Sequence, residues 1–256
     1  MNITQSKRLF LLGGYDLEML TIKQLLEGRD DCVVMDKHLR WDNARLSAYK
    51  DELQQHTYNN IYGIELQEDI TQPQHYHRID HHNDWNYKPS ALEQVAMVIG
   101  TTLNRYQQLV AANDRGYIPA MQSLSATREE IARIRKEDRK AQGVTEAEEQ
   151  LAEDSVRNNL QEYGSLRMVK SQTSRFSAIC DRLFPYKRLL IYTDHEWMFY
   201  GEGKTELVKI LKDEITEKKV FYGGGDTGYI GSVKHAYSKE KIEYFVERII
   251  KEYGKI

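Results

Sequence analysis

The sequence predicts an α/β protein with a mostly parallel-sheet N-terminal domain, a helical connector and a smaller α/β C-terminal domain. Short apolar runs alternate with helical patterns over residues 8–80, which is typical of a parallel sheet. The middle of the chain is highly charged, and the α/β alternation returns after Gly164. We therefore expect domains at residues 1–121 and 165–256, with the connector at residues 122–164.

Four strands are expected in the N-terminal domain. They are residues 8–12, 32–35, 61–66 and the run that ends at Asp80. Apolar positions at helical spacing predict a helix from Leu17 to Leu26, and a polar helix is expected over residues 43–56. The expected strand ends carry Asp16, Asp36, Glu65 and Asp80. Ligands of parallel sheets gather at this edge, so these carboxylates are candidates for a site.

Three capping boxes predict where later helices begin. They are Ser90 with Glu93, Thr127 with Glu130, and Thr145 with Glu148. The first opens a long helix that we expect to run to about residue 113. The other two open charged helices with few apolar positions, which predicts solvated connectors, with disorder around residues 141–143 as the alternative.

The C-terminal region again alternates strands with helices. Its expected strands are residues 166–169, 189–192, 197–200 and 220–222. Its expected helices are residues 176–183, 206–215 and 239–253.

Composition is that of an ordinary soluble protein without a membrane segment, and we expect a cytoplasmic location. Of the 256 residues, 40% are hydrophobic and 29% are charged, and no apolar run approaches the roughly 20 residues of a membrane span. Cys32 and Cys180 lie far apart in apolar surroundings, which favours buried thiols in a reducing compartment. The net charge is −3, divided as −4 over residues 1–120, −3 over residues 121–164 and +4 over residues 165–256. This asymmetry suits an anionic substrate.

Histidines gather just after the fourth expected strand. Residues 75–84 hold four of the eight histidines and two aspartates. Imidazole and carboxylate are ligands of Zn²⁺ and Mn²⁺, so this density indicates a metal site. On an extended strand His75 and His77 share a face, and for this pair we favour hydrogen-bonded or surface side chains.

The triplet Asp80-His81-His82 resembles the signature of the DHH phosphoesterases, which include exonucleases, oligoribonucleases, cyclic-dinucleotide phosphodiesterases and family II pyrophosphatases. Asp16 and Glu18 keep the spacing of the first family motif, although Leu12 stands where the family has a histidine. The second motif matches Glu65, with Asp36 as the other candidate. Asp114, between Ala111 and Gly116, matches the fourth motif. The resemblance covers roughly residues 8–120.

The resemblance implies a metal-binding N-terminal domain. Such sites hold two divalent ions ~3.5–4 Å apart, which share the attacking water and clamp the phosphoryl group. Mn²⁺ is expected, with Mg²⁺ or Zn²⁺ as alternatives, and Leu12 leaves one ion or impaired catalysis open. The implied ligands are Asp16, Glu18, Glu65, Asp80, His81 and Asp114. His82 would face the substrate phosphate, and His82 and Asp80 are the implied catalytic residues.

The resemblance also implies an accessory substrate-binding domain. The three glycines Gly223, Gly224 and Gly225 match a family motif, but Asp226 replaces its histidine. Successive glycines let backbone N–H groups approach a phosphate, and a tight turn is the alternative. Lys234 and His235 are further candidates for phosphate contact, with a solvated loop as the alternative.

The leading hypothesis is a metal-dependent phosphoesterase that hydrolyses a phosphoester in a nucleotide or short oligonucleotide. Its partners would be a small phosphorylated substrate or a short single-stranded nucleic acid, with a homodimer as one candidate assembly. A second hypothesis is a catalytically impaired protein that binds a nucleotide or other phosphorylated ligand as a sensor. A third is a nucleotide-binding α/β protein in which Asp80-His81-His82 is coincidental. The sequence leaves the substrate, the number of ions and the oligomeric state open.

Overall fold

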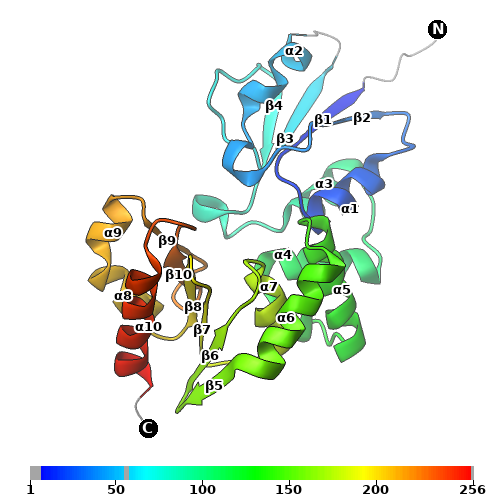
Figure 1. Cartoon of the computed structure of the whole chain (residues 1–256). Helices are drawn as coiled ribbons and strands as arrows, with labels where there is room; N and C mark the ends of the chain where they lie inside the picture. Colours follow the sequence, from blue (N-terminus) through cyan, green and yellow to red (C-terminus); the bar gives the residue numbers. More distant parts are fainter. Residues whose placement is uncertain (1–6, 55–57, 255–256) are drawn as a thin grey trace, which may run out of the picture. The chain divides into compact units, whose positions relative to one another are not determined.

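The computed structural model describes residues 7–54 and 58–254 of the chain (Figure 1). It consists of two compact units, Met1–Gly143 and Val144–Ile256, called the first and the second unit below. The division falls inside the expected connector, so one of its two helices belongs to each unit. No helix among the described residues has the length and apolar character that crossing a membrane requires.

The first unit is built on a four-stranded parallel sheet. Its strands are β1 (Arg8–Leu12), β2 (Cys32–Asp36), β3 (Asn60–Ile64) and β4 (Tyr76–Ile79). They lie in the order β2-β1-β3-β4, and every neighbouring pair is parallel. Leu9, Phe10 and Leu11 in the central strand β1 are fully buried, as an apolar run covered on both faces requires. All four strands therefore end at one edge of the sheet.

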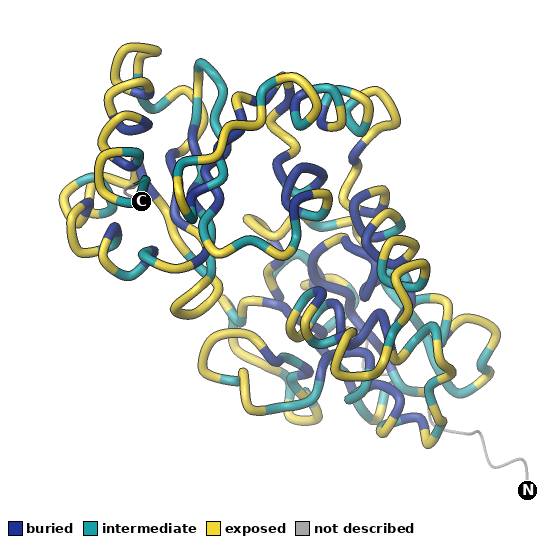
Figure 2. Tube along the Cα trace, turned by 90° about the horizontal axis from the view of Figure 1, so that it is seen from below, coloured by how far each residue is buried: buried dark blue, intermediate teal, exposed yellow. Residues whose placement is uncertain are grey.

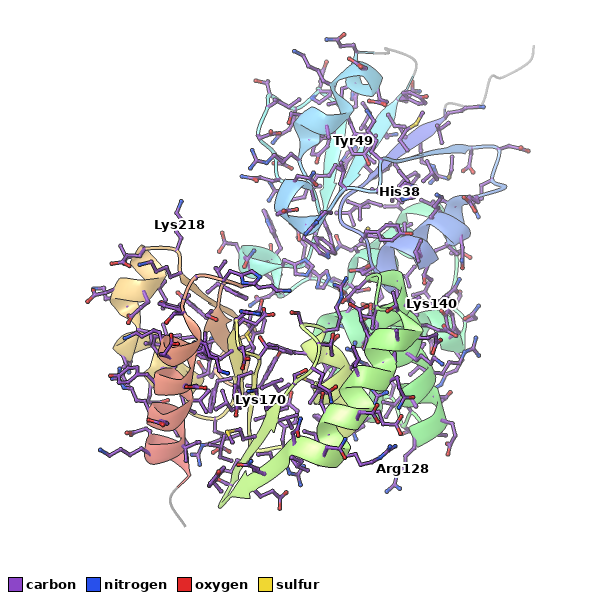
Figure 3. The ribbon with its side chains drawn as sticks, viewed as in Figure 1. His38, Tyr49, Arg128, Lys140, Lys170 and Lys218 are labelled. Atoms are coloured by element: carbon purple, nitrogen blue, oxygen red, sulfur yellow. The ribbon has the colours of Figure 1, made fainter. Side chains whose placement is uncertain are left out.

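Helices surround this sheet. They are α1 (Leu17–Leu26), α2 (Lys50–Leu53), α3 (Ala91–Ile99), α4 (Arg105–Ser123) and α5 (Arg128–Ala141), with the 3₁₀ turns η1 (Trp41–Asn43), η2 (Leu46–Tyr49) and η3 (Asn83–Trp85). The polar helix expected over residues 43–56 is wrong, because short turns replace it; residues 55 and 56 lie outside the described part. Tyr49, which is labelled in Figure 3, anchors these turns, since its buried hydroxyl donates to the Leu12 carbonyl.

The single long helix expected after Ser90 is also wrong. Gly100 adopts the left-handed conformation, with φ of +68°, and ends α3. Asn104 and Gln107 form a further capping box that begins α4. Glycine tolerates this conformation without strain, so the glycine separates two helices although apolar residues continue beyond it.

The expectation that both charged helices are solvated is wrong, because α6 (Glu146–Asn159) packs against elements of the second unit and α5 is partly buried as well. Helix α5 packs against α1 and α4 and buries Ile134, Arg135 and Asp138. The Arg135 guanidinium pairs with Asp138 at 2.8 Å and donates to Asn113 Oδ1 at 2.9 Å. Burial of these charges costs less because they are paired. Polar residues can therefore occupy buried positions of α5, and the sequence pattern does not reveal that these positions are buried.

The second unit contains a six-stranded mixed sheet in the order β5-β6-β7-β8-β10-β9. Its strands are β5 (Leu160–Tyr163), β6 (Leu166–Lys170), β7 (Arg188–Tyr192), β8 (Trp197–Gly201), β9 (Val220–Gly223) and β10 (Tyr229–Ser232). Its helices are α6 (Glu146–Asn159), α7 (Phe176–Leu183), α8 (Lys204–Ile210), α9 (Lys212–Thr216) and α10 (Lys239–Tyr253). The sequence analysis missed β5 and β10, and the helix expected at 206–215 is divided between α8 and α9.

Buried residues follow the strands and the inner helix faces of each unit (Figure 2). In the second unit Trp197 and Phe199 belong to a core shared with α8 and α10, and a separate core joins the other face of the sheet to α7. Cys32 and Cys180 are free thiols.

The predicted charge asymmetry does not follow the two units. Residues 1–143 hold 18 Lys and Arg against 20 Asp and Glu, a net charge of −2. Residues 144–256 hold 18 against 19, a net charge of −1. The acidic helix α6 belongs to the second unit and cancels its excess of basic residues.

Candidate metal centre

The carboxyl ends of β3 and β4 place a glutamate beside a histidine. Glu65 directly follows β3, and Asp80 and His81 follow β4. The Glu65 N–H donates to the Ile79 carbonyl at 2.8 Å, so the two strands remain paired up to the site. Glu65 Oε1 consequently lies 3.2 Å from His81 Nε2.

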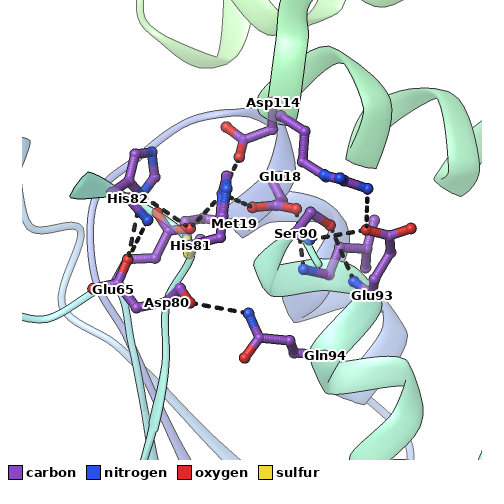
Figure 4. Close-up of polar contacts among 12 residues, drawn as sticks. Glu18, Met19, Glu65, Asp80, His81, His82, Ser90, Glu93, Gln94 and Asp114 are labelled. Carbon is purple, nitrogen blue, oxygen red and sulfur yellow. Dashed lines mark hydrogen bonds and ion pairs between the residues drawn. The ribbon is translucent and has the colours of Figure 1, made fainter. Parts of the chain in front are cut away.

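Two helices bring further carboxylates to the same imidazole nitrogen (Figure 4). Asp114 Oδ2, from α4, lies 2.5 Å from His81 Nε2, and Glu18 Oε2, from the first turn of α1, lies 3.8 Å away. The other carboxylate oxygen of Glu18 accepts from the Leu92 N–H at 3.0 Å, which ties α1 to the start of α3. His81 thus faces carboxylates from three separate parts of the first unit.

Several buried atoms at this point have no hydrogen-bond partner among the described residues. They are Glu18 Oε2, Glu65 Oε1 and Oε2, His81 Nε2 and Asp114 Oδ2. His81 Nε2 and Asp114 Oδ2 are nevertheless close enough for an ion pair when His81 is protonated. Each unsatisfied buried polar group costs about 1–3 kcal/mol, and the four carboxylate oxygens share only one imidazole, so they indicate a missing positive partner. The donor set of carboxylate oxygens and imidazole nitrogen fits a divalent cation.

Electrostatics at the site agree with this interpretation. Burial, and then the negative charges of Asp114 and Glu65, raise the pKa values of Glu18 and Asp16 well above their ordinary values. Burial opposes the charged form of His81, but Asp114 and Glu65 outweigh it and raise the His81 pKa to about 10. In the metal-free protein a proton on His81 therefore provides positive charge among the carboxylates.

His82 lies at the exposed side of this group. Its side chain is 47% exposed, and its Nδ1 atom is 3.7 Å from Glu65 Oε1. Asp80 Oδ1 accepts from the His82 N–H at 2.9 Å and lies 3.5 Å from His82 Nδ1. The contact with Asp80 is the main reason that the His82 pKa is raised. Gln94 donates to the Asp80 carbonyl at 3.1 Å and so holds the Asp80 backbone in place. Asp80 can therefore orient His82 through the contacts of its carboxylate.

The structure brings some of the residues that the sequence analysis proposed as ligands into one group and places others outside it. Glu65, His81, His82 and Asp114 form one group, with one donor atom from each within 4.8 Å of the others. Glu18 borders this group through His81, whereas Asp80 is outside it. Asp16 is buried but caps α1, where it accepts from the Met19 N–H at 2.9 Å.

The two candidates for the second motif are clearly separated. Glu65 is in the group, whereas Asp36 forms an ion pair with Lys23 at 3.0 Å and accepts from the His38 N–H at 2.8 Å. Leu12, at the position of the family histidine, is 1% exposed among apolar residues.

The proposed substrate residues of the second unit do not form one group. Gly224, Gly225 and Asp226 lie in the turn between β9 and β10, whereas Lys234 and His235 follow β10 at the opposite end of this hairpin. The sequence analysis gave Lys204 no role, but its buried ammonium donates to the Gly225 carbonyl and so supports the turn.

The parallel sheet thus carries a histidine–carboxylate group at its carboxyl edge, and a second α/β unit follows along the chain. No protein-family model matches the chain, and no curated protein matches it significantly.

Among solved structures, the pGpG-specific phosphodiesterase PggH from Vibrio cholerae superposes with a TM-score of 0.50 and 13% identity, over 97% of this chain and 98% of that one. RecJ from Thermus thermophilus, in complex with Mn²⁺, gives a TM-score of 0.46 and 11% identity, over 98% of this chain and 52% of RecJ. The likeness to PggH establishes the fold, so the chain has the fold of that phosphodiesterase.

Proposed function

We propose that this chain is a metal-dependent phosphoesterase that hydrolyses a phosphoester in a nucleotide or short oligonucleotide. The convergence of unpaired buried atoms from Glu18, Glu65, His81 and Asp114 supports this proposal most strongly. Free thiols at Cys32 and Cys180 are compatible with a reducing cytoplasm, where we place the protein.

Glu65, His81 and Asp114 would hold the cation, with Glu18 beside them. We propose Mn²⁺, with Mg²⁺ or Zn²⁺ as alternatives, and Asp16 as a further ligand if a second ion binds. A divalent cation supplies a Lewis acid that polarises a phosphoryl oxygen and makes water a better nucleophile.

The chain's own contribution lies mainly with His82. Its exposed imidazole is next to the proposed ligands, so it can donate to a phosphate oxygen and stabilise developing negative charge. Asp80 favours the protonated imidazole and holds its orientation through the His82 N–H. We assign Gly223, Gly224, Gly225 and Asp226 to binding of the remaining substrate, as a separate part of the proposal.

A binding protein without turnover is the second candidate. Leu12 in place of a histidine, together with Glu18 and Glu65 in place of aspartates, favours it because these changes alter the first two family motifs.

Turnover distinguishes the two candidates. The wild type, His81→Ala and Asp114→Asn are assayed with Mn²⁺ on dinucleotides, cyclic dinucleotides, 3′,5′-bisphosphates and pyrophosphate. Hydrolysis that both variants abolish supports the enzyme. His77→Ala is the matched control, because this exposed histidine contacts Asn60 outside the site, and it should keep full activity. Mn²⁺ and nucleotide binding without hydrolysis would support the sensor.

A further inference from the structure

An exposed tryptophan lies beside the candidate metal centre. Trp41 begins the 3₁₀ turn η1, which contains no buried residue, and the side chain is 48% exposed. Its ring centroid is 6.1 Å from that of His82. A tryptophan in a core buries about 150–250 Å² of surface. This position leaves much of the indole open to solvent next to the site.

The turn between β1 and α1 fixes the position of the ring. Gly14 has φ of +68°, and a Cβ atom built on it would lie 2.3–2.5 Å from three carbon atoms of the Trp41 indole. The indole therefore lies directly on the Gly14 backbone. A Cβ atom built on the preceding residue, Gly13, would likewise lie 2.5 Å from the Glu65 carbonyl oxygen. One turn thus contacts both Trp41 and the residue that carries a proposed ligand.

Other aromatic rings near this edge are already engaged. Lys88 lies over the Trp85 ring at 4.0 Å, and Arg78 lies over it at 5.3 Å. Tyr15 meets His38 edge to face, with 5.3 Å between ring centroids. No Lys or Arg covers the Trp41 ring within residues 7–54 and 58–254. Trp41 is consequently the best placed ring for stacking on a ligand.

We propose that Trp41 stacks on the base of the nucleotide whose phosphate lies at Glu65, His81 and Asp114. This inference rests on the proposed function, because it takes the position of the phosphate from the metal centre. In a nucleotide, one ribose separates the base from its phosphate. The rings of His82 and Trp41 lie 6.1 Å apart, so a phosphate beside His82 would place its base within reach of Trp41. Stacking on an indole accepts every base, because every base has a π-face. The site therefore selects nucleotides over phosphates that lack a base.

The test compares substrates with and without bases. Trp41→Ala and Trp41→Phe are assayed with Mn²⁺ on a purine dinucleotide and on the same dinucleotide lacking both bases. Loss of one stacking contact weakens binding by about 1–3 kcal/mol, so Trp41→Ala should lower kcat/KM on the purine dinucleotide about 5- to 150-fold. It should leave the abasic substrate unchanged, and Trp41→Phe should recover most of the loss. Tyr87→Ala, at a tyrosine that is 72% exposed, is the control and should change neither value.

Equal losses on both substrates would overturn the inference, because they would mean that Trp41 only supports the turn at Gly14. If the wild type hydrolyses neither substrate, calorimetry with Mn²⁺ and a purine mononucleotide replaces the assay. Weaker nucleotide binding with unchanged Mn²⁺ binding in Trp41→Ala would then support stacking although hydrolysis fails. Nucleotide binding that Trp41→Ala leaves unchanged, or no binding by the wild type, would overturn it.

Discussion

Replacing His81 by alanine should destabilise the metal-free first unit strongly. His81 is 7% exposed and faces Glu18, Glu65 and Asp114, and its raised pKa means that it is protonated at neutral pH. His81→Ala removes this positive charge and leaves the buried carboxyl groups of Glu65 and Asp114 without it.

Breaking a buried ion pair by removing one partner costs about 3–5 kcal/mol. The total stability of a natural domain is ~5–15 kcal/mol, so the variant loses a large fraction of it. A cation that still binds the remaining carboxylates would restore part of the loss. At 100 times its dissociation constant it contributes about 2.7 kcal/mol.

Urea unfolding followed by circular dichroism measures this effect, first with EDTA and then with Mn²⁺. We expect His81→Ala to lose much of its free energy of unfolding in EDTA and to recover part of it with Mn²⁺. His77→Ala is the control, and its free energy of unfolding should fall by less than about 1 kcal/mol, as for most surface changes. If His81→Ala loses no more than His77→Ala in EDTA, the reasoning about buried charge is refuted.

Three further predictions follow from the contacts. The pKa of His81 in the folded state lies above its unfolded value, so its contribution to stability is full below about pH 6.5 and is lost as the pH rises towards about 10. In EDTA, the free energy of unfolding of the wild type should fall over this pH range, and that of His81→Ala should not. Equal slopes for the two proteins would contradict the prediction. Gly14→Ala should lower the free energy of unfolding in urea more than Gly28→Ala, because both positions have positive φ but only a Cβ on Gly14 meets Trp41. Equal losses of about 1–2 kcal/mol would mean that backbone strain alone is responsible. Lys204→Met removes the contact with the Gly225 carbonyl and should speed hydrogen exchange at residues 224–228, whereas the control Lys209→Met should not. Unchanged exchange in Lys204→Met would show that the turn does not depend on this contact.

Strand positions in the first unit could be predicted because they are marked by short apolar runs between breaks. β1 is fully apolar after Arg8, and β4 ends where Asp80 begins the histidine-rich triplet. The break at Gly100 was missed because apolar positions continue on both sides, although the left-handed glycine ends α3 and the Asn104 cap begins α4.

The candidate site was partly accessible from the sequence. Glu65 and His81 could be placed together because they follow neighbouring parallel strands. The sequence did not indicate that Asp80 would turn towards the His82 backbone, or that Asp16 would cap α1, since both depend on local hydrogen bonds. Trp41 was missed although a tryptophan between Arg40 and Asp42 in a polar segment is itself a signal of an exposed aromatic side chain.

Anomalous diffraction from crystals soaked in Mn²⁺ tests the metal centre most directly. We predict a peak in the anomalous difference map bounded by Glu65, His81 and Asp114, which disappears in crystals of Asp114→Asn. A map without a peak at these three side chains, at a Mn²⁺ concentration that saturates any binding seen by calorimetry, would contradict the existence of the metal centre.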